Sequence, residues 1–141
     1  MAECLVLHIL RDAKPATSSF VHDLRWNAEL VDLLPTEFAI IISSESERAA
    51  QEAAKRGENW HAFDPSIHAR EKGTDEVIVI GDGFREQLIV WGRGDFDNNG
   101  TEDLLVQTFD TITEGTYRNT RLYLLGRKLG QQSLSVVRRL L

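Results

Sequence analysis

The chain has 141 residues, of which 42% are hydrophobic and 27% are charged, with 22 acidic against 16 basic residues and a net charge of −6. This is the composition of a globular protein, and the length is close to the commonest size of one domain, so we expect a single domain over residues 1–141. A net negative surface repels phosphate backbones. The charge therefore argues against nucleic acid as a partner and leaves either a basic protein partner or a role in solubility.

The N-terminal residues predict no export signal or membrane span. No stretch approaches the roughly 18 consecutive apolar residues that a membrane-spanning helix requires. Glu3 stands where a signal peptide would carry basic residues, which indicates a cytoplasmic protein, or a periplasmic or extracellular one if a leader was removed. The single cysteine, Cys4, lies in an apolar run, so we expect a buried structural thiol.

The first half of the chain predicts alternating strands and helices. Residues 4–10 form a short apolar run that favours a strand. Apolar residues then recur at helical spacing from Ser18 or Ser19 to Leu34, and Pro35 ends the predicted helix. Residues 38–42 indicate a buried strand.

A second helix is predicted from Ser44, because Ser44 and Glu47 have the spacing of a capping box and Gly57 suits a helix end. From there the pattern becomes β-rich, with five predicted strands over residues 77–80, 84–91, 104–109, 118–126 and 133–138. This order favours an α+β fold, in which N-terminal strand and helix elements pack on a C-terminal antiparallel β-meander of about five strands.

The loop over residues 95–103 carries the strongest functional signal. Oxygen-bearing side chains occupy alternate positions at Asp95, Asp97 and Asn99, Gly100 follows, and Asp103 closes the set. Calcium takes six to eight oxygen ligands, and a glycine permits the sharp turn that brings such side chains together. The alternative is a metal-free hairpin turn, since Asp, Asn and Gly are also common turn residues. Crowded carboxylates repel one another unless a cation neutralises them, which favours bound calcium.

The same residues resemble a known kind of calcium loop. The pattern Asp95-x-Asp97-x-Asn99-Gly100-x-x-Asp103-Leu104 is similar to the loops of FG-GAP and VCBS repeats in integrin α-subunit propellers, where the loop joins two antiparallel strands. The resemblance covers about 20 residues and occurs once, so it does not predict a propeller. The run after the loop also resembles small bacterial proteins that end in such a loop and meander. The resemblance implies a Ca²⁺ cofactor held by the side chains of Asp95, Asp97, Asn99 and Asp103 and by the backbone carbonyl of Thr101.

Aromatic and basic residues supply the remaining candidates. Trp60, His61 and Phe63 lie in a predicted loop and form either a partner-binding surface or a locally packed cluster. Trp26 and Trp91 lie within periodic elements and are expected in the core. Four basic residues near the last strands are expected on a solvated face or, as a less favoured alternative, on a face for an acidic partner: Arg118, Arg121, Arg127 and Lys128.

No nucleophile–base arrangement, phosphate loop or histidine metal spacing occurs in the sequence. We therefore expect a non-enzymatic, calcium-stabilised module that binds another protein, for example as an inhibitor or immunity-type partner. Two alternatives remain open. One is a metal-dependent enzyme that uses Asp95, Asp97 and Asp103, and the other is a structural domain of a larger envelope assembly.

Overall fold

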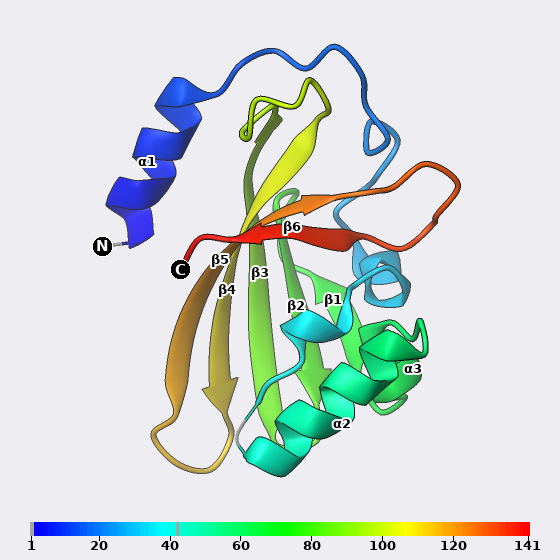
Figure 1. The fold of residues 1–141 in the computed structure, drawn as a ribbon. Helices are drawn as coiled ribbons and strands as arrows, with labels where there is room; N and C mark the ends of the chain where they lie inside the picture. Colours follow the sequence, from blue (N-terminus) through cyan, green and yellow to red (C-terminus); the bar gives the residue numbers. More distant parts are fainter. Residues whose placement is uncertain (1, 42) are drawn as a thin grey trace.

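A helix at the N-terminus precedes a six-stranded antiparallel sheet in the computed structural model, which describes residues 2–41 and 43–141 (Figure 1). Each strand pairs with the next along the chain, in the order β1 to β6. The fold is therefore α+β, as the sequence predicts. The helical elements are α1 (Ala2–Asp12), the 3-10 helices η1 (Ala28–Asp32) and η2 (Thr36–Phe38), α2 (Ser44–Lys55) and α3 (Trp60–Phe63). The strands are β1 (His68–Glu71), β2 (Glu76–Gly81), β3 (Phe84–Gly94), β4 (Asp103–Ile112), β5 (Arg118–Gly126) and β6 (Ser135–Arg139).

The larger hydrophobic core lies between one face of the sheet and the helical layer that contains α2 and α3. Side chains alternate between the two faces of a strand, so Leu88, Val106 and Tyr123 enter this core from neighbouring strands. The chain between α1 and α2 covers them with Trp26, whose indole nitrogen donates to the carbonyl of Leu88, and with Phe38, which packs 4.8 Å from the Tyr123 ring between centroids.

We call the opposite side of the sheet the reverse face. Helix α1 covers only part of this face. Val6 of α1 packs against Leu105, Leu122 and Leu124, and these residues form a second, smaller core. No helix in the described part of the chain is long and apolar enough to cross a membrane.

The predicted strand over residues 4–10 is wrong, because these residues form α1. A short apolar run fits both elements, and the partly buried residues Leu5, Ile9 and Leu10 around Val6 show helical spacing. Glu3 in the first turn and Arg11 in the last also complement the helix dipole. The thiol of Cys4 faces solvent on this helix and is not buried.

The predicted helix from Ser18 or Ser19 to Leu34 is also wrong. Its apolar residues Val21, Leu24 and Leu30 are buried, but they lie in an irregular segment that contains only η1. Polar side chains there bond to the backbone and so compete with helix formation, as when the hydroxyl of Ser19 accepts from the amide of Val21.

The predicted strand over residues 38–42 is replaced by η2 and an unpaired segment through residue 41. Phe38 is fully buried, as expected for this apolar run, but it ends η2 and pairs with no neighbouring strand. Residue 42 lies outside the described residues. A short apolar run indicates that a segment is buried but does not decide its secondary structure, and Phe38 is buried here without pairing in a β-sheet.

The helix predicted from Ser44 is confirmed as α2, although its capping box differs. Ser43 is the N-cap: its hydroxyl accepts from the amide of Ser46, three residues on, and its own amide donates to the Ser46 hydroxyl. Gly57 follows the helix with a positive φ of 78°, as expected for a helix end.

The five strands predicted in the second half are confirmed as β2 to β6. The sequence missed β1, whose residues His68–Glu71 are mostly polar and largely exposed at the edge of the sheet. An edge strand exposed in this way lacks the apolar alternation on which the prediction depends.

Candidate metal centre

The loop over residues 95–102 closes the hairpin between β3 and β4. Gly94 and Asp103 are the last paired residues of the two strands. Asn98 and Gly100 adopt positive φ angles of 68° and 84°, which turn the chain sharply back toward β4. Asn and Gly are the residues that adopt this conformation most readily, so the local sequence accounts for the tight loop.

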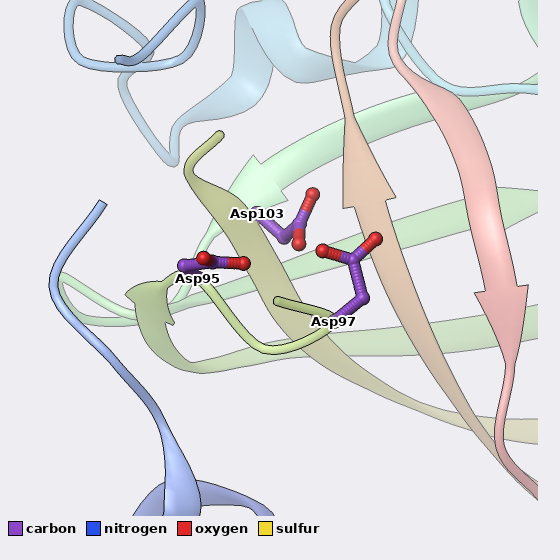
Figure 2. Close-up of side chains that lie close together, drawn as sticks. All are labelled: Asp95, Asp97 and Asp103. Atoms are coloured by element: carbon purple, nitrogen blue, oxygen red, sulfur yellow. The ribbon is translucent and has the colours of Figure 1, made fainter. Parts of the chain in front are cut away.

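Three carboxylates gather inside this loop. One oxygen from each of Asp95, Asp97 and Asp103 lies within 4.8 Å of the others, and the three groups face a common space (Figure 2). Asp95 and Asp103 are buried, and Asp97 is partly buried. The sequence pattern therefore identified side chains that the fold brings together.

Backbone amides of the loop hold two of these carboxylates in place. The two oxygens of Asp95 accept from the amides of Asn99 at 3.1 Å and Gly100 at 2.8 Å. Asp97 accepts from the amide of Asn99 at 3.3 Å. Burial alone would raise the pKa of Asp95, but the amide hydrogen bonds outweigh it, so the pKa lies below its usual value. Asp95 is therefore charged at neutral pH.

Asp103 is the unsatisfied member of the cluster. Its side chain sits at the start of β4, only 2% of the residue is exposed, and its Oδ2 atom has no hydrogen-bond partner among the described residues. Burial, followed by the charge of Asp97, raises the pKa of Asp103 to about 7. A buried carboxylate oxygen without a partner costs free energy, and a cation placed among the three carboxylates would remove that cost.

The chain after α1, residues 13–19, crosses the same loop and is here named the strap (Figure 1). Lys14 exchanges two backbone hydrogen bonds with Asp95, at 3.1 and 3.0 Å. The carbonyl of Gly100 accepts from the amides of Thr17 and Ser18, and the carbonyl of Ser18 accepts from the amide of Glu102. The conformation of the loop therefore determines where the strap lies, and through it where α1 ends.

The other two predicted ligands lie on the outer part of the loop. Asn99 is exposed, and its Oδ1 atom accepts from the amide of Thr101 at 2.9 Å. The hydroxyl of Thr101 lies 3.3 Å from that of Ser18. The ligand roles of the Asn99 side chain and the Thr101 carbonyl stay predictions.

The predicted partner-binding cluster is a packed feature of the fold. Trp60 is fully buried and stacks on Phe84 with ring centroids 6.0 Å apart. Phe63 packs against the same core, and His61 Nδ1 lies 2.6 Å from a carboxylate oxygen of Asp32. Of the two interpretations that the sequence left open, local packing therefore holds for Trp60. Trp91, expected in the core, is instead 41% exposed.

A buried charge cluster inside the sheet was missed. Arg121, predicted on a solvated face, is only 5% exposed, and its guanidinium lies 3.2 Å from Glu86 and 3.1 Å from Asp110. It also donates to the backbone carbonyls of Glu37 and Phe38. Burial and the nearby charge of Asp110 raise the pKa of Glu86 well above its usual value. Strand alternation could have revealed Arg121, since it shares a sheet face with Tyr123 two residues on.

Comparisons with protein-family models, with curated proteins and with solved structures found no match. The similarity of residues 95–104 to FG-GAP and VCBS loops thus depends on these residues alone.

Proposed function

We propose that this protein is a calcium-stabilised protein-binding module without catalytic activity, and that Ca²⁺ closes the loop between β3 and β4. The observation that supports calcium is the buried Oδ2 atom of Asp103, which has no hydrogen-bond partner among the described residues and belongs to a carboxylate that lies beside those of Asp95 and Asp97. A divalent cation among these groups would neutralise their repulsion and give the orphaned oxygen a ligand bond.

Calcium suits this donor set better than the softer transition metals. The loop offers three carboxylates, and the proposal adds the amide oxygen of Asn99 and the carbonyl of Thr101, all of which are oxygen ligands. No histidine or cysteine joins the cluster in the described residues. Water would complete the six to eight positions that calcium takes.

A catalytic metal would need an open coordination position beside a substrate cleft. Four grooves on the described residues, of about 570, 270, 200 and 160 Å³, are lined by side chains other than those of Asp95, Asp97 and Asp103. This arrangement favours a stabilising ion over a catalytic one.

The test is thermal unfolding and calorimetric titration with Ca²⁺, beginning from chelator-treated protein. Calcium at 100 times its dissociation constant should add about 2.7 kcal/mol to the free energy of unfolding, or roughly 10 °C in Tm. Asp97→Asn should lose most of this gain. The exposed Asp75, which has no ion pair among the described residues, supplies the control Asp75→Asn, which should keep it. A titration without heat and a Tm indifferent to Ca²⁺ would refute the calcium site.

A further inference from the structure

The part of the reverse face that α1 leaves open carries arginines. Across the strands, Arg85 of β3 faces Thr111 of β4, which in turn faces Arg118 of β5. The adjacent row of the same face runs from Arg70 of β1 to Phe109 of β4. It passes through the paired residues of β2 and β3. We name this surface the arginine face and define it by six residues: Arg70, Arg85, Gln87, Phe109, Thr111 and Arg118.

The three guanidinium groups of this face are exposed and uncompensated. Arg70, Arg85 and Arg118 have no ion pair with any residue in the described ranges. The acid in the next row, Glu76, lies 3.8 Å from the amine of Lys72. The chain as a whole carries −6, so this cluster of unpaired positive charge contrasts with the molecule around it.

The centre of the face is hollowed. A shallow pocket of about 160 Å³ is lined by Arg85, Gln87, Phe109 and Thr111, and Arg118 borders it through its pairing with Thr111. The side chain of Arg85 therefore lines the same hollow as a half-buried aromatic ring, and Arg118 stands on the next strand. This combination suits a ligand that has carboxylates separated by apolar or small groups.

The strand spacing sets the spacing of the ligand's charges. Arg85 and Arg118 lie two strands apart, which is about 10 Å between their backbones, and β1 lies about 10 Å further along the same direction, with Arg70 displaced by two residues along its strand. A chain in the polyproline II conformation rises about 3.1 Å per residue and returns its side chains to the same side every third residue, so three residues cover the distance between these strands at each step.

We propose that the arginine face binds an acidic segment of a partner protein in the polyproline II conformation, laid across the strands, with Asp or Glu at every third residue. The acidic side chains pair in turn with Arg118, Arg85 and Arg70, and the residues between the first two acids pass beside Phe109. A short segment contacts only this face, whereas a nucleic acid would also meet the negative surface around it. The inference depends on the protein-binding part of the proposed function and not on calcium.

The probe is a fluorescent peptide of about ten residues with Glu at every third position and Ser elsewhere. Fluorescence anisotropy at low ionic strength measures the affinity of this peptide for three proteins. These are the unmodified protein, the double variant Arg85→Gln/Arg118→Gln, and the matched control Arg25→Gln/Arg48→Gln. The control changes the net charge equally, at two exposed arginines on other elements. Thermal unfolding of each variant checks that it folds.

We expect the Arg85→Gln/Arg118→Gln protein to bind the peptide about tenfold more weakly, and the control to stay within about twofold of the unmodified protein. A peptide with the same composition but consecutive Glu residues should also bind more weakly. Three outcomes would overturn the proposal: no binding by the unmodified protein, equal losses in both variants, or tighter binding of an oligothymidylate of equal charge.

Repeating the titration with Ca²⁺ and with chelator separates this inference from the calcium site. Peptide binding in a protein whose Tm ignores Ca²⁺ would remove the calcium site and leave the arginine face. Calcium stabilisation without peptide binding would remove the arginine face and leave the calcium site.

Discussion

A single buried guanidinium, that of Arg121, faces two carboxylates inside the sheet. Glu86 and Asp110 are 0% and 1% exposed, and they belong to the two strands that precede β5. The cluster joins three strands to the carbonyls of Glu37 and Phe38, so it fixes the position of η2 over the sheet. A well-packed apolar cluster could give similar stability, but it would not orient these elements by hydrogen bonds.

Arg121→Ala should therefore destabilise the protein strongly, because it leaves two buried acids without a counter-charge. We expect a loss of about 3–5 kcal/mol in the free energy of unfolding, measured by urea denaturation. Arg118→Ala, at an exposed position on the same strand, should cost less than about 1 kcal/mol. Equal losses in the two variants would show that the buried cluster contributes no more than a surface residue.

The raised pKa of Asp103, about 7, makes the calcium-free protein sensitive to pH. The folded chain holds this proton more tightly than the unfolded chain, in which an Asp has a pKa of about 3.9. The contribution of Asp103 to stability therefore falls as the pH rises from about 4 to about 7.

Asp103→Asn should remove this dependence in the presence of chelator. The Tm of the variant relative to the unmodified protein should be higher at pH 8 than at pH 5, as measured by thermal unfolding across that range. The comparison isolates Asp103 from Glu86, whose raised pKa acts in the same direction in both proteins. A Tm difference that is constant with pH would contradict the assignment.

The strap and the loop over residues 95–102 form one unit of structure assembled from two segments far apart in the chain. Gly100 is the contact point, since an added Cβ atom would meet the Thr17 hydroxyl at 3.0 Å and the residue has a φ of 84°. Gly130 has a φ of 80°, but a Cβ there would meet nothing within 4 Å. Alanine substitutions at Gly100 and Gly130 therefore separate the cost of backbone strain from the cost of displacing the strap.

Gly130→Ala should cost about 1 kcal/mol from backbone strain alone. Gly100→Ala should cost this amount and a further loss of about 1 kcal/mol, because the strap must shift from the loop. Both values can be measured by urea denaturation in chelator. Equal losses would indicate that the strap adjusts to the added methyl group without cost.

The elements that could be predicted from the sequence are those whose signal is local. Strands β2 to β6 follow from alternation and turn residues, and the three carboxylates follow from their spacing in one loop. The segment 4–10 is apolar enough for either a strand or a helix, and only packing against Leu105 and Leu122 decides the outcome. The contact between the strap and the loop joins residues 83 apart, such as Thr17 and Gly100, so no local pattern reveals it.

Across the whole molecule, proposed roles occupy different parts of the sheet. The loop over residues 95–102 lies at one end of the β3–β4 hairpin, the helical layer covers one face, and the arginine face occupies part of the opposite one. The most deeply buried charges lie on the face under the helical layer, on β3, β4 and β5. Substitutions in the loop and on the arginine face should therefore have nearly additive effects on the free energy of unfolding, since the two regions share no residue.

The 83-residue separation between Thr17 and Gly100 also has a consequence for synthesis of the chain. α1 and the strap leave the ribosome before β4 and β5, so their docking site is completed only after those strands have emerged. Until then the apolar side of α1, including Val6, has no permanent cover and is open to chaperones. α1 is thus translated before its docking site but reaches its native position after it.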